Sequence, residues 1–359
     1  MNSGRRISPA SLLLLLGCIA FPEVTIRGRL AAQESVPKKA GEWQEQSMRV
    51  GTLDRWFRIY RPQSLRERAP AVVLLHGGTQ SMRKIFAPRA GGTRAWIDIA
   101  DREGVLLIVP NGVNPKTGDT RGDNQNWNDL RSQDSDRNST ADDVAFLRQL
   151  RNEMVSNNRL DDTRIYVTGA SNGGMMTYRL LLEAPECFAA AATFIAVLPA
   201  GMQETPPPRR PTPLLIANGT LDPLIPWKGG PVRGQSEPLM SAPANLDWWI
   251  RANRADRDRV TEERLADTSP DDGCRLIQSL YPAGTGGAPV LFLKMEGAGH
   301  ALPSRAHAVP DTWMVRRLIG PLCQDAEGAE LAWSFLSQFP SPIVRKPVPP
   351  DQPPAGSLR

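Results

Sequence analysis

Short apolar runs alternate with longer amphipathic stretches along most of the chain. The runs are rich in Val, Leu and Ile, which is typical of strands that are buried on both faces of a sheet. They predict strands at residues 56–60, 71–75, 105–109, 164–168, 214–217 and 290–294. Helical spacing of apolar residues predicts helices at residues 140–155 (with Thr140 as N-cap), 172–182 and 329–339. This alternation predicts an α/β fold with a mainly parallel central sheet and helices on both faces.

The N-terminal pattern is different and indicates export. Arg5 and Arg6 precede an apolar run from Ser11 to Phe21. Such a run is typical of a signal peptide, and it is too short to cross a bilayer, which needs about 20 apolar residues. We therefore expect a signal peptide over residues 1–32 and a secreted, extracellular protein, with a periplasmic location as the alternative.

A lipid anchor is a second alternative for the N-terminus. Leu15-Leu16-Gly17-Cys18 loosely resembles a bacterial lipobox, which would end the signal before Cys18 and place a lipid on that residue. Ala31 and Ala32 offer small residues to an ordinary signal peptidase, although Leu30 fits the site poorly. We favour simple secretion over a lipid anchor, and we expect no transmembrane span.

One catalytic domain is expected between the two ends of the chain. We predict a polar leader at residues 33–49, the catalytic domain at 50–339 and a Pro-rich, disordered tail at 340–359. A domain of this length is near the upper end of the single-domain range. We recognise no internal repeat and no appended module, and we expect a monomer.

Composition and charge argue against some classes of protein. The formal net charge is +5 and the pI is about 9.2, but the basic residues are scattered, so we expect no nucleic-acid partner. No CxxC pattern is present, so we expect no structural zinc. An exported chain can form one disulfide among Cys187, Cys274 and Cys323, and the sequence leaves all three pairings open.

The most informative motif is Gly169-x-Ser171-x-Gly173, which lies directly after a predicted strand and before a predicted helix. That context distinguishes a nucleophile elbow from a chance match. The turn is sharp, so small residues on either side of the serine let strand and helix approach each other. It also places the hydroxyl at a helix N-terminus, where backbone N–H groups favour negative charge. We predict that Ser171 is the nucleophile of an α/β-hydrolase fold.

The base and the acid follow from the chain order of this fold, which is serine, acid, histidine. His76 precedes Ser171 and is excluded by this order. His307 lies in a polar segment, and we interpret it as a surface residue. His300 follows a predicted strand through a short loop and is the predicted base. Asp222 follows an earlier predicted strand and is the predicted acid, with a turn before proline as its alternative role.

The loop His76-Gly77-Gly78 resembles a loop that supplies one N–H group to an oxyanion hole. Either Gly78 or Thr79 would supply this group, and Asn172, directly after the nucleophile, would supply the other. Glycine lets the backbone approach a substrate closely. We expect His76 to shape the loop without transferring a proton.

Several motifs occur in order along the chain. They are Pro110-Asn111-Gly112, Asn126-Trp127-Asn128-Asp129, Asp142-Asp143-Val144-x-Phe146-Leu147, Gly169-x-Ser171-Asn172-Gly173-Gly174-Met175, Gly219-Thr220-x-Asp222 and Gly299-His300-x-x-Pro303. Together they resemble the polyhydroxybutyrate-depolymerase-like and feruloyl esterase family of secreted esterases, over about residues 50–339. The resemblance implies an α/β-hydrolase fold, a triad of Ser171, Asp222 and His300, and no metal or organic cofactor. Members cleave hydroxycinnamoyl or acetyl esters on plant polysaccharides, or polyester chains.

Two residues bear on the substrate. Many family members have Trp two residues after the histidine, where this chain has Leu302, and this position would border the substrate. Trp127 is either a platform for a sugar or phenolic ring or a buried anchor for the loop at residues 114–139, and the sequence favours neither. The acidic residues of that loop lack the spacing of an EF-hand calcium site. Asp142 and Asp143 fit the negative charges at a helix N-terminus.

We therefore predict a secreted serine esterase that acts on feruloyl or acetyl esters of plant polysaccharide. A polyhydroxyalkanoate depolymerase is the alternative. A serine peptidase of the same fold is less favoured, because the resemblance is to esterases. A non-catalytic carbohydrate-binding relative is also less favoured, because binding alone does not require Ser171, Asp222 and His300 together.

Overall fold

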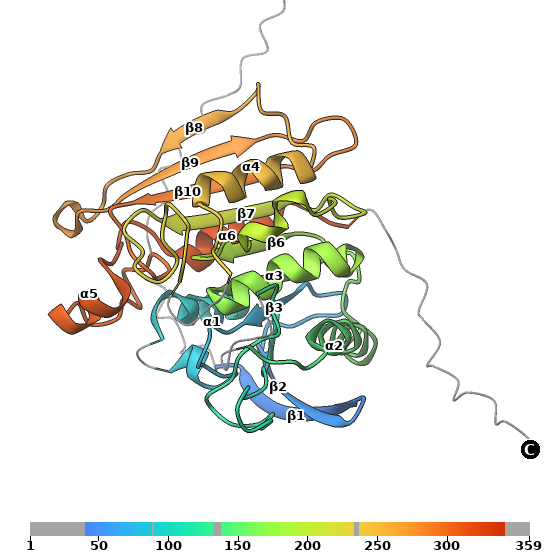
Figure 1. The fold of residues 1–359 in the computed structure, drawn as a ribbon. Coiled ribbons are helices and arrows are strands. Elements are labelled where there is room, and N and C mark those ends of the chain that lie inside the picture. Colours follow the sequence, from blue (N-terminus) through green and yellow to red (C-terminus); the bar gives the residue numbers. More distant parts are fainter. Residues whose placement is uncertain (1–39, 88–89, 132–137, 233–236, 342–359) are drawn as a thin grey trace, which may run out of the picture. The chain divides into compact units, whose positions relative to one another are not determined.

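A ten-stranded sheet with the strand order β1-β2-β4-β3-β5-β6-β7-β10-β9-β8 forms the centre of the structure (Figure 1). The computed structural model describes residues 40–87, 90–131, 138–232 and 237–341. The strands are β1 (Glu42–Val50), β2 (Leu53–Arg61), β3 (Ala71–Leu75), β4 (Leu106–Pro110), β5 (Ile165–Ala170), β6 (Ala191–Phe194), β7 (Leu214–Gly219), β8 (Thr261–Arg264), β9 (Arg275–Tyr281) and β10 (Val290–Glu296). Six neighbouring strands are parallel to one another, namely β4, β3, β5, β6, β7 and β10. Antiparallel pairs extend the sheet at both edges, with β2 and β1 beyond β4 and with β9 and β8 beyond β10. The expected mainly parallel sheet is confirmed.

Helices cover both faces of the sheet (Figure 1). The covering helices are α1 (Ala95–Glu103), α2 (Asp143–Asn158), α3 (Asn172–Glu183), α4 (Ala242–Ala252) and α6 (Gly328–Leu336), whereas the further helix α5 (Trp313–Ile319) has no buried residue. Val73 of β3 packs into the core that α2, α3 and α4 cover, whereas Val72 and Leu74 pack into the core of α1 and α6. Successive side chains of a strand point to opposite faces, so a strand that is covered on both sides is apolar throughout.

The segment that was predicted as a polar leader, residues 33–49, contains most of strand β1. This strand pairs with β2 along its whole length and lies at the edge of the sheet. Of its residues only Met48 is buried. An edge strand that is largely exposed carries polar residues, and its pattern therefore resembles that of a leader. The sheet begins at Glu42 rather than at residue 50, which corrects the predicted boundary.

The N-cap of α2 is Asp142, and the prediction of Thr140 is wrong. Asp142 Oδ1 accepts a hydrogen bond from Ala145 N at 2.9 Å. A capping side chain has to lie directly before the first helical residue, so Thr140 is too far from the helix. Asp143 turns inward, and its buried carboxylate pairs with the equally buried Arg55 at 2.5 Å.

A disulfide joins Cys274, directly before β9, to Cys323, in the segment between α5 and α6. This finding selects one of the three pairings that the sequence left open. Cys187 is buried and takes no part in the disulfide.

The ends of the chain are only partly described. Ser341 lies within the predicted disordered tail, but it is buried, and its N–H donates to Thr163 O at 2.6 Å. The signal peptide, Cys18 and the rest of the tail lie outside the described residues. Within the described residues, no helix combines the length and the apolar character that crossing a membrane requires.

Candidate active site

Ser171 lies in the turn between β5 and α3, with φ 55° and ψ −122°. This is a backbone conformation that residues with a side chain rarely adopt, and such strain is concentrated at functional sites. A Cβ atom on Gly169 would lie 2.3 Å from Gly173 O, and one on Gly173 would lie 2.3 Å from Leu75 O. Both glycines of the motif are therefore required by the close approach of backbone segments, as the sequence predicts for a sharp elbow.

Asp222 and His300 meet across the ends of β7 and β10. His300 Nδ1 lies 2.7 Å from Asp222 Oδ2, and the Asp222 side chain is 1% exposed. Asp222 Oδ1 also accepts from the N–H groups of Leu224 and Ile225, each at 2.8 Å. The turn role and the histidine-partner role, which the sequence set against each other, are thus combined. The turn fixes one carboxylate oxygen and thereby aims the other at His300.

Backbone hydrogen bonds to the end of α5 and to the segment after it hold the loop that carries His300. His300 N donates to Ile319 O at 2.5 Å, and Ser304 N donates to Cys323 O at 2.9 Å. The disulfide connects this second segment to Cys274 at the start of β9. The position of the imidazole therefore depends on a cross-linked pair of loops.

A cleft of about 1120 Å³ lies beyond the carboxyl ends of the central strands, the usual place for a site in such a sheet. Its lining includes the predicted site residues Gly78, Thr79, Ser171, Asn172, His300 and Leu302. Loops after β4 contribute polar side chains, which are Asn114, Lys116, Asn124, Asn126 and Arg131. Segments after β7 and at the end of α5 contribute apolar residues, which are Pro223, Leu224, Ile225, Pro226, Ile319 and Leu322.

Neither His76 nor His307 is among the described residues that line this cleft. His76 is fully buried, and this burial lowers its pKa to about 4. Its Nε2 accepts from Gly112 N at 3.0 Å, and its Nδ1 lies 2.8 Å from Gly77 O, so the neutral ring donates from Nδ1. His307 is half-buried, and its Nε2 lies 3.3 Å from Oδ2 of the exposed Asp98.

The structure separates the two candidates for the first oxyanion-hole donor. Thr79 N already donates to Asn126 Oδ1 at 2.7 Å, so this N–H is not available to a substrate. Gly78 N has no acceptor among the described residues. A Cβ on Gly78 would lie 3.6 Å from Asn172 Cβ, and Asn172 N belongs to the first turn of α3, where no intrahelical acceptor exists. The backbone N–H groups of Gly78 and Asn172 therefore have no acceptor among the described residues, whereas that of Thr79 has one.

Trp127 is the buried anchor, the second of the two roles that the sequence left open. The side chain is 0% exposed, and its ring packs on His76 with 4.8 Å between ring centroids. Its Nε1 donates to His76 O at 2.9 Å. A ring that is enclosed in this way cannot stack on a sugar. Leu302, by contrast, does line the cleft.

Five apolar side chains of the loop after β7 and of helix α5 are exposed, and no sequence motif marked them. We call this group the apolar rim, and its members are Leu221, Leu224, Trp313, Met314 and Leu318. Helix α5 has no buried residue. Its end meets the loop after β7, because a Cβ on Gly320 would lie 2.9 Å from Leu221 O. The apolar residues between positions 313 and 319 were the sequence signal that could have indicated this exposed apolar helix.

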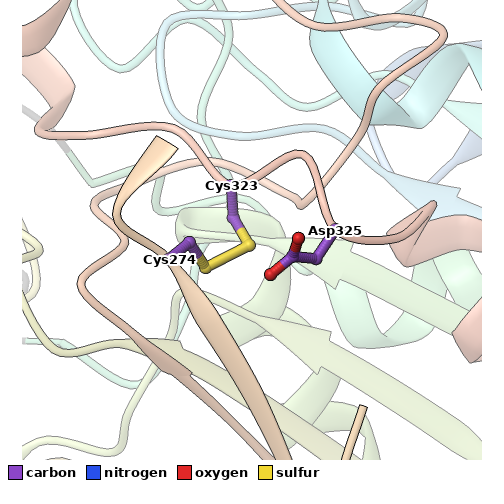
Figure 2. Close-up of side chains that lie close together, drawn as sticks. All are labelled: Cys274, Cys323 and Asp325. Carbon is purple, nitrogen blue, oxygen red and sulfur yellow. A yellow bond between two sulfur atoms is a disulfide. The ribbon is translucent and has the colours of Figure 1, made fainter. Parts of the chain in front are cut away.

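Figure 2 shows a group of Cys274, Cys323 and Asp325, the described residues that come close enough to suggest a metal site. The two sulfur atoms are bonded to each other, whereas cysteine binds metals as a free thiolate. Asp325 Oδ1 instead accepts from Thr268 N and Ser269 N at 2.9 and 3.0 Å. The carboxylate supports a loop, and the group gives no reason to invoke a metal.

A parallel sheet between two helical layers, a serine on a strained strand–helix turn and a histidine bonded to a buried carboxylate define an α/β-hydrolase. Residues 100–207 match the prolyl oligopeptidase family. The putative esterase NocK of Nocardia uniformis subsp. tsuyamanensis is 29% identical over 67% of this chain and 67% of its own length. Feruloyl esterase B of Piromyces equi is 31% identical over 56% of this chain and 32% of its own length. A poly(3-hydroxybutyrate) depolymerase of Ralstonia pickettii is 30% identical over 41% of this chain and 30% of its own length.

This chain therefore spans about a third of the length of the last two relatives. The matches agree with the motif resemblance, because the relatives to which this chain is similar carry the names of esterases and of a depolymerase.

Proposed function

We propose that this protein is a serine esterase in which Ser171 is the nucleophile, His300 the general base and acid, and Asp222 the residue that orients His300. The observation that carries the proposal is the 2.7 Å contact between His300 Nδ1 and Asp222 Oδ2, beside a cleft that Ser171 also lines. The order of the three residues along the chain is the one that α/β-hydrolases use.

The first half-reaction forms an acyl-enzyme. Ser171 Oγ attacks the carbonyl carbon of the ester while its proton passes to His300 Nε2. Asp222 holds the tautomer with hydrogen on Nδ1 and stabilises the imidazolium. The N–H groups of Gly78 and Asn172 donate to the carbonyl oxygen as it becomes negative. When the C–O bond breaks, His300 gives its proton to the leaving alcohol.

The second half-reaction returns the enzyme to its starting state. A water molecule attacks the acyl carbon while His300 Nε2 takes its proton, and the same two N–H groups stabilise the oxyanion. The bond to Ser171 Oγ then breaks, the proton passes from His300 to this oxygen, and the free acid leaves.

Feruloyl or acetyl esters of plant polysaccharide are the proposed substrates. Feruloyl esterase B and acetylxylan esterases are among the relatives that support this choice. The apolar part of the cleft suits an acyl group, and the polar part, with Asn114 and Asn124, offers hydrogen bonds to sugar hydroxyls. Leu302 would border the substrate, where many family members carry an aromatic ring.

A polyhydroxyalkanoate depolymerase is the second candidate, and the apolar rim is the observation that favours it. Trp313 is 74% exposed, and Leu224 of the rim also lines the cleft. Several exposed apolar side chains on two neighbouring segments mark an interaction site more often than an isolated apolar residue does. A water-insoluble polyester would contact such a surface while one of its ester bonds enters the cleft.

A peptidase or a non-catalytic relative is less favoured. The match to the prolyl oligopeptidase family ends at residue 207, before Asp222 and His300, so it rests on the sheet and the elbow. Such shared architecture does not determine the reaction. A relative that only binds carbohydrate would not need a buried carboxylate bonded to His300.

The proposal is tested by hydrolysis of p-nitrophenyl acetate and methyl ferulate, with the chain that begins at residue 33 and its Ser171→Ala variant. We expect the variant to lose turnover on the order of 10⁶-fold, by analogy with other serine hydrolases. A variant that keeps a tenth of the wild-type rate would refute the role of Ser171. A folded wild type that cleaves neither ester, but releases acid from polyester film, would select the second candidate.

We also propose export under the direction of residues 1–32, and a monomeric state. N-terminal sequencing of the mature protein would distinguish cleavage near Ala32 from a lipid-blocked Cys18. Sedimentation would measure the oligomeric state.

A further inference from the structure

The side chain of Asn172, directly after the nucleophile, is held by a single loop. Its Oδ1 accepts from Trp127 N at 2.8 Å. Its Nδ2 donates to Asp129 Oδ2 at 2.5 Å and to Trp127 O at 3.3 Å. The amide has thus used its acceptor and both donor hydrogens on the loop, and Asn172 is 3% exposed. Only its backbone N–H remains for the proposed oxyanion hole.

The same loop also holds the other half of the hole. Asn126 Oδ1 accepts from Thr79 N at 2.7 Å, and Trp127 Nε1 donates to His76 O at 2.9 Å. Residues 126–129 therefore cross-link the loop after β3 to the first turn of α3. The relative position of the two proposed donors, at Gly78 and Asn172, depends on this segment.

Asp129 brings a negative charge close to these donors. Its side chain is 0% exposed. A buried carboxylate near an oxyanion hole opposes the negative charge that develops there, because electrostatic interactions are strong where water is excluded. Arg131 offsets this charge, since its Nε lies 2.8 Å and its Nη2 lies 2.6 Å from Asp129 Oδ2. Arg131 also lines the cleft.

We propose that Asp129 and Arg131 act together as positioning residues of the oxyanion hole. Asp129 fixes Asn172 through its side chain, and Arg131 cancels the negative charge that this fixing introduces. The inference rests on the proposed esterase function. Both residues act through the position of Asn172 and through the electrostatic potential at the oxyanion hole, and neither transfers a proton.

Other charged groups meet the loop and stay constant in the experiment. Arg179 of α3 donates from Nη1 to Asn128 O at 2.7 Å. Asp143 of α2, which is paired with Arg55 of β2, accepts from Asn128 N at 2.6 Å. Arg55 compensates the charge of Asp143, and Arg131 compensates that of Asp129. Removing Arg131 therefore leaves Asp129 without its ion-pair partner.

The charges of Asp129 and Arg131 can be removed singly and together. Arg131→Gln leaves a buried carboxylate unpaired, and such a group takes up a proton as the pH falls. We expect kcat for p-nitrophenyl acetate to fall on the order of tenfold at pH 8, with little change in KM. The ratio of variant to wild-type kcat should rise towards one as the pH is lowered. Asp129→Asn keeps an acceptor for Asn172 Nδ2, so its loss should be smaller and its ratio independent of pH.

The double variant Asp129→Asn, Arg131→Gln is the decisive one. It lacks both charges, so we expect it to be more active at pH 8 than Arg131→Gln alone. A merely structural role for Arg131 predicts the opposite, because a second substitution would add to the damage. A pH profile of Arg131→Gln that runs parallel to that of the wild type, or a double variant that is no better than Arg131→Gln, would overturn the inference.

Two controls separate this inference from the proposed function. Arg102→Gln removes an exposed arginine that pairs with Glu330 far from the cleft, and it should leave all rates unchanged. The rate at which a fluorophosphonate labels Ser171 is the second readout, because phosphonylation uses the same hole and needs no ester substrate. If the wild type is labelled but hydrolyses no ester, the function is wrong, and the labelling rates still decide the inference. If the wild type is not labelled at all, both fail.

Discussion

The two sides of the cleft are built on different principles. On the oxyanion side Asn172 and the loop residues Trp127 and Asp129 are buried, and hydrogen bonds join this loop to Asn172. On the side of His300 the neighbouring helix α5 has no buried residue. There the loop is held by backbone hydrogen bonds to Ile319 and Cys323 and by one disulfide.

The difference follows from what each side has to do. N–H donors stabilise an oxyanion only if they are oriented before the charge develops, so a cross-linked buried network suits them. The side chains of the apolar rim face solvent, and in our proposal they contact the substrate. Substitutions should therefore damage stability on the first side and substrate use on the second.

The two tryptophans test this contrast with the largest expected effect. Trp127→Ala removes a fully buried ring and should lower the free energy of unfolding by about 3–5 kcal/mol. Trp313→Ala removes a ring that is 74% exposed and should change it by less than about 0.5 kcal/mol. Urea denaturation measures both values. Equal losses in the two variants would contradict the contrast.

The disulfide is expected to matter for both stability and activity. Cys274→Ser opens a link between residues 49 apart in sequence and should cost about 2–4 kcal/mol of stability. It should also lower kcat, since Cys323 O supports the loop that carries His300. A Cys187→Ser variant is the matched control. Unchanged kcat in folded Cys274→Ser would show that the link does not position His300.

His76 should make the oxyanion side sensitive to acid, with the smallest effect of the three. Burial lowers its pKa to about 4, below the usual histidine value of 6.5. The unfolded chain therefore binds a proton first as the pH falls below 6.5, and stability is lost between pH 6.5 and 4. The loss from this residue between pH 7.5 and 5.5 should be about 1 kcal/mol. His76→Gln should show a correspondingly flatter dependence of unfolding free energy on pH.

The sequence predicted the parallel core of the sheet well, because strands such as β3 are short, rich in β-branched residues and apolar on both faces. It failed at the edge, where β1 carries the polar pattern of a solvated segment. Strand β6 was missed because the short, alanine-rich stretch Ala191–Phe194 has weak strand propensity. This segment is a strand because it pairs with β5 on one side and with β7 on the other.

The candidate site was predictable where a motif has a single geometric explanation. Glycines beside Ser171, and the order of Ser171, Asp222 and His300, needed no tertiary information. The choice between Gly78 and Thr79 did need it, because it depends on where Asn126 lies across the fold. The roles of Trp127 and Asp129 also depend on packing between segments that are distant in sequence.

The central claim is that Ser171 is the reactive nucleophile, and peptide mapping after reaction with a fluorophosphonate tests it most directly. The account predicts a single adduct, on Ser171, which forms much more slowly when His300 is replaced by Ala. An adduct on another residue, or a folded protein that the probe does not label, would contradict it.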